Sequence, residues 1–128
     1  IKIELERALK YSSGEWSASQ IVTRAISEPH LFQIWEILED DSVIGIGSTR
    51  VMQYNNFIAL HIITLGSKNI YDEMPNLITI FENMVKKYEN IDVLEYTGRR
   101  GFIKQLSTVG WEERYTTMRK SLKENLDV

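Results

Sequence analysis

The sequence FIALHIITL, residues 57–65, is a near-continuous apolar run of strand length. Such a run is typical of a strand covered on both faces, because side chains along a strand point alternately in opposite directions. Asn55 and Asn56 precede the run and Gly66 follows it, and these residue types favour turns. We therefore predict that residues 57–65 form a central, buried strand of a sheet.

Two stretches upstream of this run are typical of a β-hairpin. Residues 31–39 (LFQIWEILE) and 43–54 (VIGIGSTRVMQY) are rich in branched and aromatic side chains, and the polar residues 39–42 (EDDS) lie at their junction. Gly45 and Gly47 have no helix directly after them, so they indicate a bulge or close packing rather than a nucleotide-binding loop. We predict two antiparallel strands joined by a tight turn.

The amino-terminal part of the chain carries apolar residues at helical spacing. Within residues 1–11 the apolar side chains fall on one helix face. Gly14 follows, and glycine readily adopts the positive φ angle that ends many helices. Residues 18–28 repeat the pattern, with Ser17 as a candidate cap and Pro29 as a stop. The chain is therefore predicted to open with two helices.

Downstream of the central run, helices and strands alternate. We predict a helix that ends near residue 88, a strand over residues 91–96, a short helix over residues 101–109 and a closing strand over residues 112–122. Parallel strand pairs need such helical crossovers, whereas hairpins give antiparallel pairs. The resulting order, α-α-β-β-β-α-β-α-β, predicts an α+β fold with a mixed, mostly antiparallel sheet flanked by helices.

Length and composition narrow the class of protein. The 128 residues favour a single domain over residues 1–128, with 43% hydrophobic and 26% charged residues as in ordinary globular domains. The absence of cysteine excludes disulfides, thiolate metal sites and a cysteine nucleophile, and with two histidines we predict no metal site. No apolar run reaches the ~18 residues of a membrane span, so we expect none.

Charge is spread unevenly along the chain. The formal net charge of −3 argues against sequence-independent nucleic-acid binding, yet residues 99–123 contain seven basic and two acidic side chains. Arg99, Arg100 and Lys104 cluster at a predicted strand-to-helix turn, where the helix dipole also favours anions. We expect these three cations either to bind a phosphate or an acidic partner surface, or simply to form a solvated face.

The order of elements and the ending VLEYTGRRGFIKQLSTVGWEERYTTMRKSL, residues 93–122, resemble the GNAT family of N-acetyltransferases. Within this ending, LSTVGW (residues 106–111) resembles the family's junction, in which a glycine ends the last helix and an aromatic residue starts the closing strand. The resemblance spans the whole chain in layout and is strongest over residues 57–122. The chain is similar in particular to the small GNAT-like proteins of tailed bacteriophages, such as internal virion protein A. This implies an acyl-CoA N-acyltransferase-like fold.

The resemblance does not extend to the family's cofactor loop. Members hold acetyl-CoA with an Arg/Gln-x-x-Gly-x-Gly/Ala loop, whose backbone amides and following helix bind the diphosphate. Residues 65–75 read LGSKNIYDEMP, and the family's arginine falls on Ile70. Asp72 and Glu73 would stand near the diphosphate, where like charges repel. The resemblance thus implies a degenerate acetyl-CoA site, and we assign no cofactor-binding residue.

The family's catalytic positions are also replaced. Its general base falls on Ala59, its tyrosine acid on Leu106 and its cofactor-binding asparagine on Arg99. Alanine and leucine side chains cannot exchange a proton, so neither acid–base role is filled in the family's way. We therefore assign no catalytic residue on the basis of the resemblance.

An enzyme on this scaffold would need other groups to move protons. The candidates are His61, Glu95, Tyr96 and Tyr115, because a general base or acid needs only a suitable pKa and reach. For His61, which lies inside the apolar run, a buried imidazole that hydrogen-bonds a neighbour is the simpler interpretation.

These observations favour a non-catalytic GNAT-like phage protein that acts through protein association, as a virion component, an assembly factor or a host-protein binder. Its partner would be a viral or host protein or a second copy of the chain, with no cofactor, in the virion or the host cytoplasm. The alternative is an acetyl-CoA-dependent N-acetyltransferase that binds the cofactor through main-chain groups of residues 65–68, with Arg99 or Arg100 on the phosphates. A third interpretation, a small-molecule or peptide sensor, predicts an apolar pocket beside Thr64 and Tyr96.

Overall fold

The computed structural model describes residue 9, residues 16–98 and residues 101–124. The elements in chain order are α2 (Ala18–Ser27), β1 (Phe32–Glu39), β2 (Ser42–Gln53), β3 (Ile58–Gly66), α3 (Ile70–Val85), β4 (Val93–Tyr96) and α4 (Gly101–Ser107). This confirms the predicted order from the second helix to the last helix. The helix predicted over residues 1–11 lies outside the described residues, Leu9 apart.

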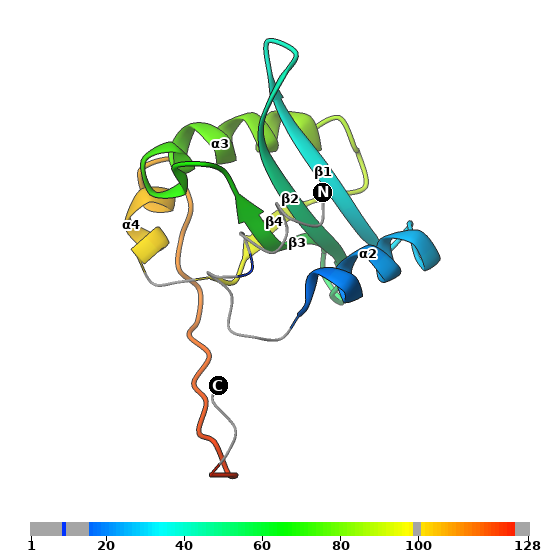
Figure 1. Cartoon of the computed structure of the whole chain (residues 1–128), viewed down its shortest axis with the longest axis vertical. Coiled ribbons are helices and arrows are strands. Elements are labelled where there is room, and N and C mark those ends of the chain that lie inside the picture. Colours follow the sequence, from blue (N-terminus) through cyan, green and yellow to red (C-terminus); the bar gives the residue numbers. More distant parts are fainter. Residues whose placement is uncertain (1–8, 10–15, 99–100, 125–128) are drawn as a thin grey trace.

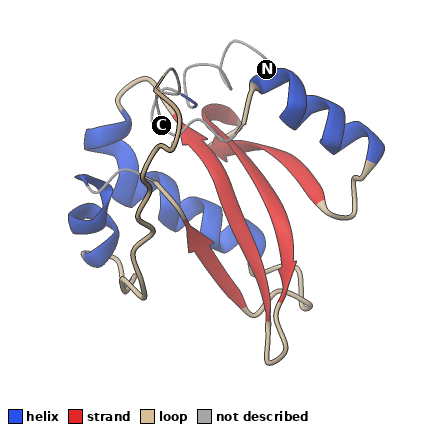
Figure 2. Ribbon diagram, turned by 90° about the horizontal axis from the view of Figure 1, so that it is seen from below, coloured by secondary structure: helices blue, strands red, loops and turns tan. Residues whose placement is uncertain are grey.

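The four strands form one mixed sheet in the order β1-β2-β3-β4. β1 pairs with β2 and β2 with β3 in the antiparallel sense, whereas β3 and β4 are parallel. The helices α3 and α4 cover one face of the sheet and α2 covers the other (Figure 1, Figure 2). The predicted α+β class, with a mixed and mostly antiparallel sheet between helices, is confirmed.

The strand β3 is central and buried, as its sequence predicts. Ile62 has no exposed surface, and Leu65 is 1% exposed. A register shift against β2 makes Ile63 an extra residue of β3, which is a β-bulge. Because of the bulge, Ile62 and Leu65 both pack in the core under α3, while Ile63 packs with the cluster that contains α2 residues.

Two local features confirm the hairpin prediction. Asp40 and Asp41 adopt positive φ angles of 49° and 66°, the left-handed conformation of a two-residue hairpin turn. Gly45 lies where a β carbon would stand 2.6 Å from Leu77 Cδ1 and 2.9 Å from Gly66 O. Close packing of β2 against α3 and β3 therefore explains this glycine, as predicted.

The closing strand predicted over residues 112–122 is wrong. These residues have no regular secondary structure, and residues 112–124 together are termed the C-terminal arm below. Figure 1 shows the arm leaving the body of the molecule near α4 and extending beyond it. A strand is stable only when its backbone pairs with another strand, and the arm has no strand partner among the described residues.

Candidate functional site

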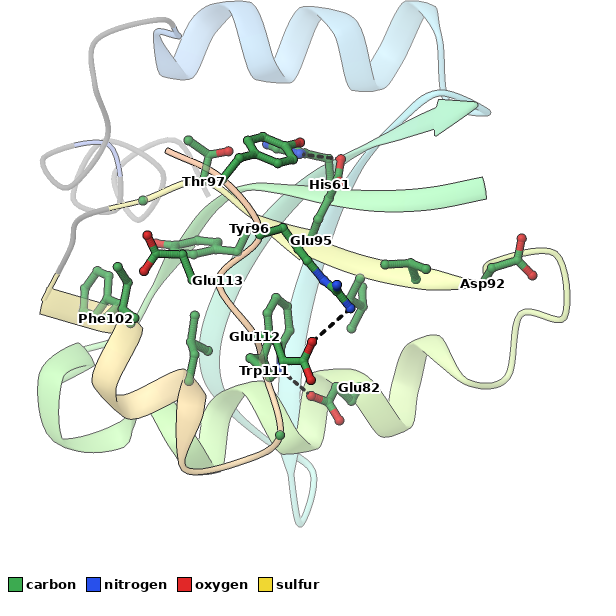
Figure 3. A pocket seen from close by; sticks show the side chains of 18 of the residues that line it. His61, Glu82, Asp92, Glu95, Tyr96, Thr97, Phe102, Trp111, Glu112 and Glu113 are labelled. Atoms are coloured by element: carbon green, nitrogen blue, oxygen red, sulfur yellow. Dashed lines mark hydrogen bonds and ion pairs between the residues drawn. The ribbon is translucent and has the colours of Figure 1, made fainter. Parts of the chain in front are cut away.

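A wide hollow of about 1610 Å³ lies along β4, between the sheet edge, α3, α4 and the C-terminal arm (Figure 3). Its walls come from residues 54–57 after β2, from His61 on β3, from parts of α3 and α4, from all of β4 and from the proximal part of the arm. The hollow is larger than the ~300–1,000 Å³ of ordinary ligand pockets. It is the place where elements far apart in the sequence meet.

β4 is the edge of the sheet and pairs with only part of β3. All of β4 lies beside residues 59–62, whereas β3 continues to Gly66. The two strands separate at this point, so the backbone of residues 63–66 has no strand partner on the β4 side within the described ranges. The opposite edge of β4 borders the hollow.

Three polar side chains meet at the wall of the hollow. Glu95 Oε1 accepts a hydrogen bond from Tyr54 Oη at 2.7 Å and lies 2.9 Å from His61 Nδ1. His61 and Glu95 occupy paired positions on β3 and β4, and Tyr54 follows the end of β2. The side chains of His61 and Glu95 are 24% and 22% exposed, so both are shielded yet reachable from the hollow (Figure 3).

The hydrogen bonds define where the protons of this cluster reside. The bond to Glu95, together with burial and the negative charge of that carboxylate, raises the pKa of Tyr54 from 10.0 to about 12, with a smaller contribution from Tyr115. The phenol therefore stays protonated and remains a donor at neutral pH. When His61 Nδ1 donates to Glu95, Nε2 is left as the proton-accepting atom of the ring.

Packed aromatic side chains line the hollow on the α3 side of β4. Trp111 Nε1 donates to Glu82 Oε1 on α3 at 2.6 Å, and the Trp111 backbone amide donates to Leu106 O at 3.1 Å. Tyr96 lies edge-to-face with Phe102, with 6.3 Å between ring centroids. The two bonds of Trp111 fix the point at which the C-terminal arm leaves the body.

Of the three cations predicted to bind an anion or a partner, Lys104 falls within the described residues. It is exposed on α4 and does not line the hollow. Arg99 and Arg100 lie outside the described residues. An anion or partner site at these three positions therefore stays a prediction.

The residues considered for an enzyme do gather at the hollow. His61, Glu95, Tyr96 and Tyr115 all line it. The prediction that His61 hydrogen-bonds a neighbour is confirmed, and the neighbour is Glu95, but the ring is partly exposed rather than buried. Sequence reasoning missed Tyr54, because its position before a turn marks only the end of a strand and gives no sign that Glu95, 41 residues later, lies beside it.

The apolar pocket predicted beside Thr64 and Tyr96 has a different form. Tyr96 lines the hollow. Thr64 is 2% exposed, and its hydroxyl is hydrogen-bonded to Ser48 Oγ at 2.7 Å. Thr64 therefore belongs to the interior of the sheet, and the hollow extends along β4 and the arm instead.

The loop between β3 and α3 departs from the GNAT cofactor loop as the sequence predicts. Ile70 is 3% exposed and packs in the core, so it cannot take the role of the family's arginine. Asp72 and Glu73 lie in the first turn of α3, where their charges complement the helix dipole but oppose a bound diphosphate. Ser67 Oγ is buried and has no hydrogen-bond partner in the part of the chain that the structure describes.

Residues 16–98 and 101–124 also bear on metal binding and on membrane crossing. No group of three or more histidine, aspartate or glutamate side chains there is placed to hold a metal ion. Nor does any helix in these ranges combine the length and the apolar character that crossing a membrane requires.

The comparisons with known proteins bear on the fold. No family model matches the sequence, and neither does any curated protein. A possible acetyltransferase from Clostridium difficile 630 is similar in structure, with a TM-score of 0.65 and 13% identity, over 94% of this chain and 87% of that chain.

Two further solved structures are similar over most of both chains. An aminoglycoside acetyltransferase from an uncultured soil metagenomic sample, in complex with sisomicin, gives a TM-score of 0.57 and 13% identity, over 94% of this chain and 85% of that chain. A GNAT family acetyltransferase from Staphylococcus aureus gives a TM-score of 0.55 and 14% identity, over 94% of this chain and 88% of that chain.

These likenesses establish the class of fold. The chain has a GNAT-like, acyl-CoA N-acyltransferase type of fold, as the resemblance in its sequence implied. At 13–14% identity they establish the fold alone. They lend no support to the phage-specific part of the resemblance, nor to a virion or protein-binding role.

Proposed function

We propose that the chain is an acyltransferase that uses the hollow to transfer an acyl group from a thioester to an amine. The similar structures are named as acetyltransferases, which supports this activity over a non-catalytic role. The observation that carries the proposal is the hydrogen-bonded cluster of Tyr54, Glu95 and His61, because it puts a proton acceptor at the wall of the hollow. Amine acylation requires a general base of this kind within reach.

His61 is the general base in this proposal. The nitrogen of the amine forms a bond to the acyl carbon, the bond from that carbon to sulfur breaks, and the proton of the amine passes to His61 Nε2. The sulfur leaves as a thiolate and takes this proton from the ring, which restores the base and gives the free thiol. Glu95 fixes the tautomer of the ring through Nδ1 and stabilises the positive charge that the ring acquires. Tyr54 donates to the same carboxylate oxygen, so it holds Glu95 in the position that serves His61.

Acetyl-CoA is the acyl donor that the fold implies, and its amide chain fits the residues present. Its thioester would supply an activated acyl carbon. Backbone groups of residues 63–66, on the side where β4 has ended, can hydrogen-bond an extended chain of amides. The buried Ser67 Oγ, which lacks a partner in the described chain, can donate to a phosphate oxygen.

The diphosphate is the part of acetyl-CoA that does not fit. Asp72 and Glu73 bring two negative charges to the first turn of α3. Two unit charges about 4 Å apart repel by ~4 kcal/mol at an effective dielectric of about 20. Lys68 is the single cation of the loop over residues 66–69. We therefore expect acetyl-CoA to bind weakly. The prediction from the sequence that the protein uses no cofactor gains no support from the similar structures, which are named as acetyltransferases.

Acyl transfer can be measured as the release of free thiol from acetyl-CoA in the presence of a panel of primary amines. We expect turnover by the unmodified chain and a fall in kcat of at least about 100-fold for His61→Gln. The matched control is His30→Gln, because His30 is the other histidine, is exposed and does not line the hollow. Equal activity of the two variants would exclude His61 as the base.

Isothermal titration with acetyl-CoA tests the donor separately from the chemistry. We expect heat of binding at millimolar ligand, because the amide chain fits and the diphosphate is opposed. Absence of both heat and thiol release at millimolar acetyl-CoA would contradict the proposal and leave the protein-association role as the better one.

Protein association is the second candidate function. One observation favours it: the C-terminal arm exposes large apolar side chains to solvent. In this case the chain is a virion component, an assembly factor or a host-protein binder, with a viral or host protein as partner in the virion or the host cytoplasm. Finding the chain in purified phage particles would support this role, and finding it only outside them would argue against the virion assignment.

A further inference from the structure

A row of side chains crosses the sheet on the face that α2 covers. In the strand register, Phe32 on β1 is paired with Arg50 on β2. Arg50 is in turn paired with His61 on β3, and His61 with Glu95 on β4. Side chains at paired positions project from the same face of a sheet and are close neighbours. His61 lines the hollow, so Arg50 stands one strand further from β4, directly beside the proposed base.

Arg50 has no carboxylate partner. Its Nε donates to Met52 Sδ at 3.0 Å, and a thioether is a weak acceptor. The terminal nitrogens of its guanidinium form no ion pair or hydrogen bond with the residues that the structure describes. Arg24 on α2 is by contrast paired with Glu28. Arg50 therefore keeps free donors in a fixed place beside His61.

This unpaired cation is partly buried. A charged group that is withdrawn from water without a partner costs free energy, and arginine is rarely buried unless it is paired. The carboxylate of the row, Glu95, is already hydrogen-bonded to Tyr54 and lies 2.9 Å from His61. The arrangement therefore indicates that an anion from outside the chain pairs with Arg50.

Charge favours a carboxylate over a phosphate as this anion. Arg50 supplies one positive charge, whereas a phosphate group carries a charge of about −1.5 to −2 at pH 7. Glu95, on the other side of His61, is itself negative and opposes additional negative charge. A guanidinium also matches the planar carboxylate, which it holds through two parallel hydrogen bonds.

We propose that the acyl acceptor is an amino acid, whose carboxylate binds Arg50 and whose amine is acylated beside His61. The inference rests on the proposed acyl transfer, because it names the amine of that reaction. His61 Nδ1 faces Glu95, so Nε2 is the atom left for the amine (Figure 3). The amine nitrogen forms the amide bond and loses its proton to Nε2, and the products are an N-acyl amino acid and the free thiol. Arg50 is then the residue that determines specificity for the acceptor.

Thiol release with matched amines tests the role of the carboxylate. L-phenylalanine and 2-phenylethylamine differ only in this group, as do L-leucine and 3-methylbutylamine. We expect the ratio of kcat/KM for the amino acid to kcat/KM for its amine to fall at least about tenfold in Arg50→Gln. Arg50→Lys should keep part of the preference, because lysine retains the charge but cannot form the two parallel bonds.

The matched control is Arg24→Gln, which removes an arginine that already has a carboxylate partner and should leave the ratio unchanged. Because the ratio compares two substrates on one preparation, a partly unfolded variant lowers both rates and does not alter it. An unchanged ratio in Arg50→Gln, with turnover of both amines, overturns this inference and leaves the proposed acyl transfer intact.

Isothermal titration of the full chain with L-phenylalanine, without acetyl-CoA, separates the two proposals. We expect binding that is at least about tenfold weaker in Arg50→Gln and unchanged in Arg24→Gln. If no amine gives thiol release but this dependence on Arg50 is seen, the acyl transfer is wrong and the carboxylate site stands. Absence of both turnover and binding overturns both proposals.

Discussion

The core under α3 and the β4 edge of the sheet differ in how completely their side chains are covered. In β1 and β3, Ile37 and Ile62 have no exposed surface and pack in one cluster with Phe81 of α3. In β4, a strand of four residues, Val93 is 39% exposed beside the hollow. Buried apolar surface is the main source of folding stability, whereas an open edge can meet other molecules. The core under α3 therefore sets stability, and the β4 edge carries the candidate functions.

The largest effect on the free energy of unfolding is expected when one aliphatic side chain is truncated in the core and one at the β4 edge. Ile62→Ala should lower the free energy of unfolding by about 2–5 kcal/mol, because it leaves a cavity under α3. Val93→Ala, on the neighbouring strand, should lower it by less than about 1 kcal/mol. Urea denaturation measures both values. A loss at Val93 as large as that at Ile62 would contradict the difference between the core and the β4 edge.

The next largest effect on the free energy of unfolding is expected where β2 packs closely against α3 and β3. A β carbon at Gly45 would stand 2.6 Å from Leu77 Cδ1 and 2.9 Å from the backbone oxygen of Gly66, so Gly45→Ala should cost about 1–3 kcal/mol. Gly47 is the matched control on the same strand, because its β carbon would meet nothing closer than Leu65 Cδ1 at 3.5 Å. Gly47→Ala should change the unfolding free energy by less than about 1 kcal/mol. Similar costs for both variants would disprove the packing argument.

A smaller effect on stability is expected at α2, the helix on the other face of the sheet. Ser17 accepts a hydrogen bond from the Gln20 amide and completes a capping box at the start of α2. Ser17→Ala should therefore cost about 1 kcal/mol, seen as a lower Tm in thermal unfolding. Ser27→Ala, at the exposed end of the same helix, should change stability by less than about 0.5 kcal/mol. Equal Tm values for the two variants would argue against the cap.

The smallest effect is a change in the titration of Tyr54 at the β4 edge. The hydrogen bond to Glu95 is the largest cause of the raised pKa of Tyr54, so Glu95→Gln should move that pKa from about 12 back toward 10.0. Spectrophotometric titration of phenolate, with Tyr54→Phe to assign the signal, measures the shift. A Tyr54 pKa unchanged in Glu95→Gln would mean that this bond is not its cause.

The sign of the corresponding pH dependence follows from the direction of the shift. The folded chain holds the Tyr54 proton more tightly than the unfolded chain does, with a pKa of about 12 against 10.0. The stabilising contribution of the bond is therefore complete below pH 10 and is lost as the pH rises through about 12. Because Tyr54 is 38% exposed, solvent screening makes this contribution small.

Local signals account for the features that were predicted well. The cap at Ser17 and the turn at Asp40 and Asp41 depend on a few neighbouring residues, and the run over residues 57–65 is long enough to require burial. The candidate site shows the limit of such signals. The bond between His61 and Glu95 joins positions 34 residues apart, so nothing near either residue reveals it.

The order of helices and strands from α2 to α4 and the α+β class were determined by the sequence by itself, because hydrophobic period, caps and turn residues act over short distances. Only the tertiary structure decided where β3 and β4 separate, which two side chains share one carboxylate oxygen of Glu95, and that residues 112–122 form no strand. Each of these depends on contacts between distant segments. The conformation of the arm also depends on whether a strand edge is available to it, and no local pattern contains that information.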